Sequence, residues 1–313
     1  MIYFYKAMKS INYTLLGDET IAKDFGKKGT STDITIYDKK ESDVVKTWTA
    51  PTGFPEKIQP LFQAINMGEY VIFYITKLDK FTGEQIVALD VLKKTQGLLC
   101  HSYEVDRNNL LAMIKGTAVE QYKLVEIDDL KKEVDAMQPL TKDGKTKISI
   151  DHCFDVKGVG AVILGKVNQG KVKTYDNLKL LPKGSDVLIK SIQMHDDPVE
   201  EAISPARVGL SVKGIIPDDV QRGDLLCIPD SVQMSQEITL DYSQNKFFKG
   251  ELGENQMFLV NIGLQIRPAK IISLKPLKLS LGKPVVFDKD DICVILKPES
   301  PTIRIVGSGA ITK

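Results

Sequence analysis

The sequence contains few cysteines, and none is placed as a metal ligand or disulfide partner usually is. Cys100, Cys153, Cys227 and Cys293 form no CxxC pair, and none lies near two histidines. A zinc site needs ligands at regular spacings, and a disulfide framework needs paired cysteines at regular spacings. We therefore expect four small buried hydrophobic side chains, with neither a metal nor another cofactor.

Long hydrophobic runs are missing as well. No stretch of the sequence approaches the roughly 18 consecutive apolar residues that make a transmembrane helix. Met1–Lys9 contains lysines but no long apolar core. The sequence thus predicts neither a membrane span nor a signal peptide, and we expect a cytoplasmic protein without a membrane partner.

Charge of one sign is not in excess. The 42 Lys and Arg residues balance 41 Asp and Glu residues, so any surface for nucleic acid must be a local patch. The hydrophobic share of 42% and the charged share of 27% are typical of a folded protein. A chain of 313 residues exceeds one compact core, which predicts two or three domains.

The first 140 residues or so alternate between strand and helix patterns, which favours a sheet covered by helices. Short, bulky apolar runs predict buried strands at Tyr13–Leu16, Tyr70–Ile75, Leu98–Cys100 and Tyr122–Val125. Helical spacing is found at Ile58, Leu61, Phe62 and Ile65, and again at Ile86, Val87, Leu89 and Val91. Two further helices are predicted to begin at N-caps, one at Asp106 or Asn108 and one at Asp128.

The helical pattern ends after Gln138-Pro139, where the polar segment Thr141–Lys145 marks a domain boundary. Short alternating segments separated by glycine and Asp/Asn turns follow, which is typical of β-barrels. A second all-β stretch carries a clean alternation that we expect on a single strand at Phe258–Ile266. The predicted fold is an α/β sheet domain at residues 1–141 and two β-barrels at 145–230 and 231–313.

Both barrels carry a resemblance to translation factors. Phe154–Val167 with Gly170–Lys173 resembles the second-domain signature of elongation factor Tu, and Val208–Leu210, Lys213–Ile215 and Arg222–Asp224 extend the match. Thr302–Ile311, preceded by Leu277–Leu279 and Lys283–Val285, is similar to the third domain of initiation factor 2 gamma and the selenocysteine-specific elongation factor.

The resemblance implies a GTPase domain at the start of the chain, yet the phosphate loop G-x-x-x-x-G-K-[ST] is absent from the sequence. After the first expected strand, Gly17 is followed by Asp18 and Glu19, and the next glycine is Gly26. Carboxylates at this position would repel a triphosphate. This predicts a P-loop-GTPase-like domain that lacks the P-loop.

Two further motifs of the family are also missing. The place of D-x-P-G-H, which holds magnesium and positions water, is taken by Pro51–Pro55, and proline can do neither. The place of the guanine-reading N-K-x-D is taken by His101–Glu104. We therefore expect a degenerate GTPase domain without hydrolytic activity and without catalytic residues.

One alternative is a divergent GTP-binding translation GTPase with an unorthodox nucleotide pocket. Its candidate residues are Gly17, Lys27, Lys28 and Thr30 for phosphate, and Glu104 for guanine. The segment Gly26–Asp33 combines glycines, two lysines and hydroxyl groups that suit an anion. The competing interpretation is a solvated surface loop.

The resemblance also implies that the first barrel holds the 3′ end and aminoacyl group of a tRNA. The matching positions are Asp151, His152, Phe154, Gln193, Arg207 and Lys213. His152 replaces an acid and Arg207 an amide, and both side chains suit ribose or phosphate. Phe154 has a second interpretation as barrel core, because aromatic residues of barrel strands are usually buried.

The hypothesis that combines these observations is a translation elongation factor-like protein that binds tRNA or the ribosome without hydrolysing GTP. Other translation proteins are further candidate partners, and DNA is not. A third possibility is a protein-interaction module, since a fold by itself implies no retained activity.

Overall fold

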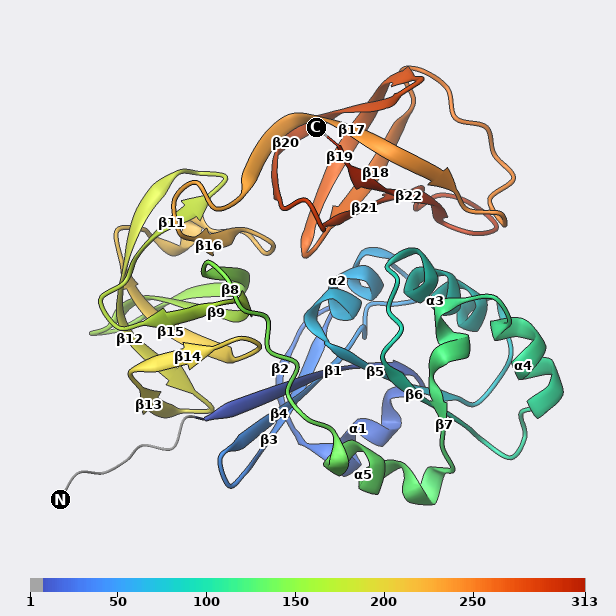
Figure 1. Ribbon diagram of the computed structural model, residues 1–313, viewed down its shortest axis with the longest axis horizontal. Helices are drawn as coiled ribbons and strands as arrows, with labels where there is room; N and C mark the ends of the chain where they lie inside the picture. Colours follow the sequence, from blue (N-terminus) through green and yellow to red (C-terminus); the bar gives the residue numbers. More distant parts are fainter. Residues whose placement is uncertain (1–7, 313) are drawn as a thin grey trace. The chain divides into compact units, whose positions relative to one another are not determined.

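In the computed structural model, which describes residues 8–312, the first part of the chain forms a seven-stranded sheet (Figure 1). Its order is β2-β3-β4-β1-β5-β6-β7, and β1, β5, β6 and β7 run parallel. The strands are β1 (Lys9–Gly17), β2 (Lys27–Ser31), β3 (Thr35–Glu41), β4 (Val44–Ala50), β5 (Tyr70–Ile75), β6 (Gly97–His101) and β7 (Lys123–Leu124). The four predicted strands are confirmed, although the last is only two residues long.

Helices cover both faces of this sheet, as Figure 1 shows. They are α1 (Ala22–Phe25), α2 (Gln59–Met67), α3 (Lys80–Val91), α4 (Arg107–Ile114) and α5 (Ile127–Ala136). On one face, apolar side chains of α2, α3 and α4 pack on β5 and β6. On the other face, Trp48 stacks between Tyr13 and Phe25 with ring centroids 5.5 Å apart, and the Tyr13 hydroxyl donates to the carbonyl of Val134 in α5.

The predicted helix starts are partly confirmed. The Asp106 carboxylate caps α4 by accepting from the backbone N–H of Asn109, so Asn108 is not the cap. The prediction for Asp128 was wrong, because Glu126 precedes α5 and Asp128 lies in its first turn, where a carboxylate favours the helix dipole instead.

The segment after the sheet domain forms a closed sheet around its own hydrophobic core. Its order is β11-β16-β8-β9-β15-β12, with β13 beside β12, and the pairing of β11 with β12 closes it. The strands are β8 (Lys147–Val156), β9 (Gly160–Gln169), β10 (Lys171–Lys173), β11 (Asn177–Leu181), β12 (Ser185–Met194), β13 (Asp197–Val199), β14 (Glu201–Ile203), β15 (Arg207–Lys213) and β16 (Leu225–Cys227). We call this the central barrel.

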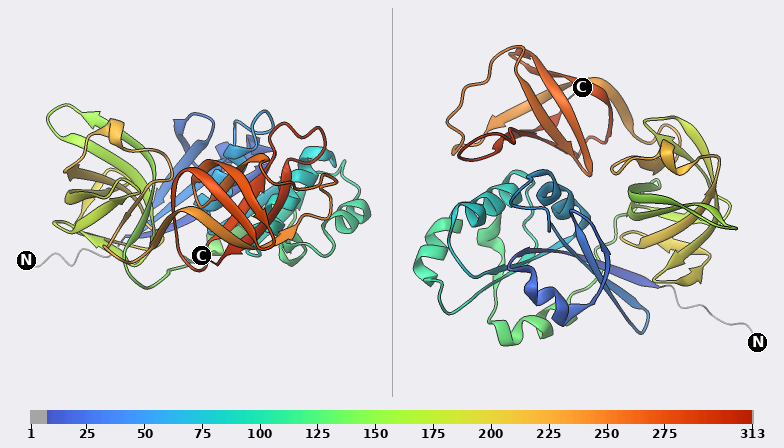
Figure 2. Two further views of the ribbon diagram at one scale, coloured as in Figure 1. Left: turned by 90° about the horizontal axis from the view of Figure 1, so that it is seen from above. Right: turned by 180° about the vertical axis from the view of Figure 1, so that it is seen from behind.

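A second closed barrel ends the chain, and Figure 2 gives two further views of it. Its order is β17-β20-β19-β18-β21-β22, and β22 pairs with β17. The strands are β17 (Gln233–Gln244), β18 (Met257–Ile262), β19 (Gln265–Leu274), β20 (Leu277–Phe287), β21 (Ile292–Leu296) and β22 (Ile305–Ile311). The single strand expected at Phe258–Ile266 is wrong, because Gly263, with a φ of +56°, turns the chain into a hairpin between Ile262 and Gln265.

The chain divides into two compact units. One contains Asp38–Thr47 and the central barrel within Gln138–Met234, and the other contains Tyr13–Tyr37, Trp48–Met137 and the last barrel within Ser235–Lys313. Cys100, Cys227 and Cys293 are buried as expected, whereas Cys153 is only half-buried. Most of Met1–Lys9, on which the signal-peptide expectation rests, lies outside the described residues. Within those residues no helix has the length and apolar content to cross a bilayer.

Candidate functional site

Three strands of the central barrel carry all six positions matched to the tRNA site. Asp151, His152 and Phe154 lie on β8, Gln193 lies on β12, and Arg207 and Lys213 lie on β15. Val208, Leu210 and Val212 of β15 point into the barrel core. Because side chains alternate along a strand, Arg207 and Lys213 face outward.

Asp151 links two of the other residues. Its Oδ2 accepts from Arg207 Nη2 at 2.6 Å and lies 3.1 Å from His152 Nδ1. The Asp151 side chain is 2% exposed, and those of Arg207 and His152 are 16% and 24% exposed. We name these three residues the Asp151 cluster.

Arg207 and His152 stabilise the Asp151 carboxylate in its charged form. Burial by itself would raise the pKa of Asp151, but the Arg207 guanidinium and the hydrogen bonds from His152 and Arg207 hold this pKa below its ordinary value. Two buried atoms of the cluster, Asp151 Oδ1 and His152 Nε2, have no hydrogen-bond partner among residues 8–312. Buried polar atoms are usually paired, so such atoms are candidates for contact with a ligand.

Phe154 is exposed at 42%, so its interpretation as barrel core was wrong. The pairing of β8 with β9 shifts between Ile150 and His152, which is a β-bulge. A bulge adds one residue to a strand and reverses the inward and outward alternation that follows it. Ile150 therefore faces the core and Cys153 packs against it, whereas Phe154 points outward.

A row of paired positions, which we call the row, runs across the strands from His152 of the cluster to Gln193. His152 pairs with Leu164 of β9, Leu164 pairs with Gly209 of β15, and Gly209 pairs with the exposed Gln193. Gly209 has no side chain, and a Cβ there would lie 3.6 Å from Leu164 Cδ2 and 4.0 Å from Gln193 Cβ, so these two side chains flank it. Leu164 and Gly209 were missed at the sequence level, although their alternation with core residues could have indicated an outward face.

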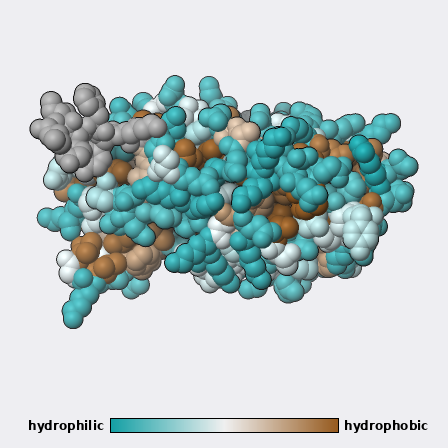
Figure 3. Space-filling view, turned by 90° about the horizontal axis from the view of Figure 1, so that it is seen from below, coloured by the Kyte–Doolittle hydropathy of each residue, from teal (hydrophilic) through white to brown (hydrophobic). Residues whose placement is uncertain are grey.

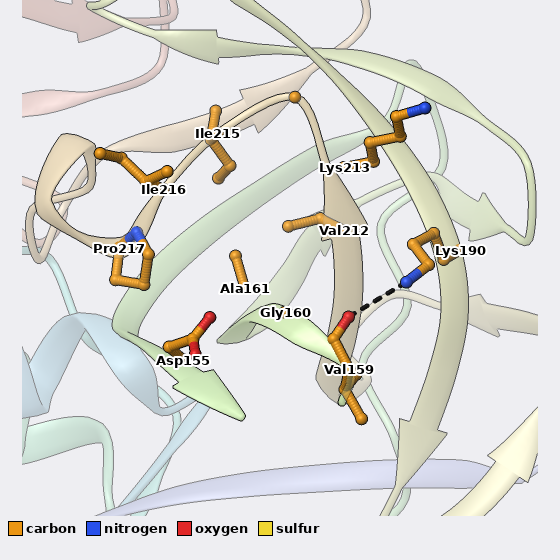
Figure 4. Close-up of a pocket in the computed structure, with 11 residues that line it drawn as sticks. Asp155, Val159, Gly160, Ala161, Lys190, Val212, Lys213, Ile215, Ile216 and Pro217 are labelled. Carbon is orange, nitrogen blue, oxygen red and sulfur yellow. Dashed lines mark hydrogen bonds between the residues drawn. The ribbon is translucent and has the colours of Figure 1, made fainter. Parts of the chain in front are cut away.

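Lys213 is not brought to the Asp151 cluster. It lies six positions along β15 from Arg207, which is about 20 Å on an extended strand. It instead lines a separate pocket of about 340 Å³ at the end of the barrel, together with Asp155 and Lys190 (Figure 4).

The backbone amides of the loop after β1, at the place of the phosphate loop, are hydrogen-bonded within the protein. The Gly17 amide donates to Gln85 Oε1 at 2.8 Å, the Asp18 amide to the carbonyl of Tyr74 at 2.8 Å, and the Thr20 amide to Asp18 Oδ1 at 2.9 Å. A Cβ on Gly17 would stand 1.9 Å from the Tyr74 oxygen. These amides therefore already donate to protein acceptors, and an anion cradle needs them free.

The residues proposed for a nucleotide site lie on or after three separate strands of the sheet. Gly17 is the last residue of β1, and Glu104 follows the parallel strand β6. Burial raises the pKa of Tyr74 on β5, and the charges of Asp18 and Glu104 raise it further. Burial and the charge of Asp18 raise the pKa of Glu19, and the charge of Lys28 lowers it. The expected loop at Gly26–Asp33 is wrong in part, because Lys27, Lys28 and Thr30 lie on the edge strand β2.

The segment Pro51–Pro55, at the place of D-x-P-G-H, follows β4 and is held by the last barrel. Arg304 Nη1 donates to the carbonyl of Pro55 at 2.7 Å, and its guanidinium lies 5.4 Å from the centroid of the Phe54 ring. Phe54 also meets Phe81 of α3 edge to face at 6.0 Å. The geometry is that of a fixed turn packed against two neighbours.

Metal-ligating side chains do not gather anywhere in residues 8–312, where no group of three His, Cys, Asp or Glu residues could hold an ion. The face of the molecule in Figure 3 is mostly hydrophilic, with hydrophobic residues in separate patches.

Comparison with known proteins identifies relatives of the whole chain and of its parts. A family model described as elongation factor Tu domain 2 matches residues 160–227. The uncharacterized protein MJ0325 of Methanocaldococcus jannaschii is 34% identical over 311 residues, 97% of this chain and 100% of that protein. The selenocysteine-specific elongation factor of the same organism is 30% identical over 77% of this chain, and elongation factor 1-alpha of Nanoarchaeum equitans is 33% identical over 68%.

This chain spans about half the length of those two elongation factors, at 56% and 52%. The solved structure of translation elongation factor SelB from Methanococcus maripaludis, in complex with the GTP analogue GPPNHP, matches with a TM-score of 0.84 at 20% identity, covering 99% of this chain and 80% of that one. The α/β sheet followed by two barrels is thus a shared fold. The chain therefore belongs to the superfamily of translational GTPases, which includes elongation factor Tu and the selenocysteine-specific elongation factor.

Proposed function

We propose that this translation elongation factor-like protein binds the end of a tRNA on the central barrel and does so without hydrolysing GTP. The observation that carries the proposal is the Asp151 cluster, which lies beside the outward-facing Phe154. A phosphate group suits the Arg207 guanidinium, and a ribose hydroxyl suits the unpaired His152 Nε2. A base suits the exposed Phe154 ring, because RNA bases stack on aromatic side chains.

The absence of hydrolysis is supported by both sequence and geometry. The phosphate-loop, magnesium and guanine motifs are missing from the sequence. The amides of Gly17 and Asp18 already donate to Gln85 and Tyr74. A triphosphate would have to break these bonds and approach Asp18 and Glu19. We further propose that the protein acts in the cytoplasm with the translation machinery, and that the sheet domain serves as a platform.

Gel-shift titrations with charged and uncharged tRNA test this proposal. We expect a salt-sensitive dissociation constant below about 10⁻⁶ M, tighter than non-specific binding. Gln193 is exposed and lies outside the buried ion pair, so Gln193→Glu adds a negative charge to the row without disturbing the barrel. This variant should bind at least about tenfold more weakly.

Gln233→Glu is the matched control, because it makes the same change of charge at an exposed position away from the row. Its affinity should equal that of the unaltered protein. Absence of binding to any tRNA would overturn the proposal. Equal weakening by both variants would show that the residues from His152 to Gln193 do not contact the tRNA.

A further inference from the structure

The pocket at the end of the central barrel has an apolar floor between charged walls. In Figure 4, Asp155 lies on one side of the pocket and Lys190 and Lys213 on the other, with Ala161 and Val212 between them. Its volume of about 340 Å³ lies within the range of small-molecule sites. The pocket thus offers one acceptor, two cationic donors and an apolar surface.

The charged side chains of this pocket remain available for a ligand. Lys190 Nζ donates to the carbonyl of Val159 at 3.1 Å, which holds the ammonium at the wall and leaves its other two protons. Asp155 and Lys213 are exposed and form no side-chain hydrogen bond or ion pair within residues 8–312. Their charges are therefore not neutralised by the protein.

We propose that this pocket binds one nucleotide of a single RNA strand, with the phosphate at Lys190 and Lys213 and the ribose 2′-hydroxyl at Asp155. This deepens the proposed function and rests on it. The 5′-phosphate and the 2′-hydroxyl lie on opposite sides of a ribose, as the lysines and Asp155 lie on opposite sides of the pocket. A carboxylate on the ribose hydroxyl is a recurring device of nucleotide recognition.

The RNA strand that contacts the Asp151 cluster can also reach this pocket. Asp151 and Asp155 are four positions apart on β8, about 13 Å on an extended strand. Ile216, which is 59% exposed, and Pro217 border the pocket and offer apolar contact to a base. The central barrel would then hold consecutive nucleotides along β8.

A charge test uses tRNA binding measured as a function of salt. The double variant Lys190→Ala/Lys213→Ala should bind about tenfold more weakly, and its salt slope should fall by about 0.7 for the lost phosphate contact. Lys171→Ala/Lys173→Ala is the matched control, because it removes two lysines of the same barrel that pair with Glu201. Equal losses of affinity and slope in both double variants would overturn the proposal.

A sugar test uses a ten-nucleotide RNA and the DNA of the same sequence. The unaltered protein should prefer the RNA by about tenfold, and Asp155→Ala should lose most of this preference. Retention of the preference in Asp155→Ala would overturn the pocket assignment alone. Absence of RNA binding by the unaltered protein would overturn the proposed function as well. Unchanged RNA binding in Asp155→Ala, together with loss of a translation protein that the unaltered protein binds, would overturn the assignment in favour of a peptide site.

Discussion

The carboxylate of Glu84 in α3 and the guanidinium of Arg304, 220 positions apart, form a buried ion pair. Arg304 Nε lies 3.1 Å from both carboxylate oxygens, Nη2 contacts Oε2, and the Arg304 amide donates to Oε1 at 2.9 Å. The two side chains are 6% and 11% exposed. Together with the bond to Pro55, this pair joins α3, the turn after β4 and the last barrel within one compact unit.

Breaking this pair on one side should destabilise that unit. Glu84→Ala leaves the Arg304 charge buried without its partner, and we expect a loss of about 3 to 5 kcal/mol in the free energy of unfolding. Denaturant titration followed by fluorescence of Trp48, the single tryptophan of the chain and a buried residue of the same unit, measures this loss. Glu254→Ala, at an exposed site of the same unit, should change stability by less than about 0.5 kcal/mol.

Guanine nucleotides should not bind. Calorimetry with GTP or GDP and magnesium should give no binding heat at millimolar nucleotide, because the amides at Gly17 and Asp18 are already bonded within the protein. Saturable binding that Lys28→Ala abolishes and Lys23→Ala leaves intact would instead support the divergent GTP-binding alternative. Lys23 provides the comparison because it is an exposed lysine of the adjacent helix α1.

Phe154 should matter for RNA and not for folding. Because its ring points outward, Phe154→Ala should change the free energy of unfolding by less than about 1 kcal/mol, far below the cost of truncating a core aromatic. Stacking of one base is worth about 1 to 3 kcal/mol, so tRNA affinity should fall about fivefold or more. Tyr175→Ala removes another exposed aromatic ring of the same barrel and should leave affinity unchanged. A large loss of stability in Phe154→Ala would contradict the outward orientation.

Acid should weaken the central barrel through Asp151. Its folded-state pKa lies below the ordinary value of 3.8, so the carboxylate is favoured by folding. The stabilisation is therefore present above about pH 4, and it is lost as the pH falls through the lower folded-state pKa. Carbon-13 NMR of the Asp151 carboxyl should show a titration midpoint below 3.8. A midpoint above that value would contradict the bond to Arg207.

The features that could be predicted from the sequence are those set by neighbouring residues. The α4 cap at Asp106 and the strand at Tyr70–Ile75 follow from local patterns, and both are confirmed. The outward Phe154 depends on a bulge at Ile150 to His152 that no local pattern reveals. The pair of Glu84 with Arg304 depends on tertiary packing, because 220 positions separate the two residues. The charged pocket at Asp155 likewise forms only when the barrel closes.

The hydrogen-bonded amides of the loop after β1 also bear on how long an RNA complex lasts. In a protein that reads GTP, hydrolysis supplies an irreversible step that limits how long a complex lasts. With Gly17 bonded to Gln85 and Asp18 to Tyr74, the duration of an RNA complex would be set by its own dissociation rate. At an affinity of about 10⁻⁶ M and an association rate of about 10⁶ M⁻¹ s⁻¹, that lifetime is about one second. Such a protein would release its RNA passively, as fast as its contacts on the central barrel allow.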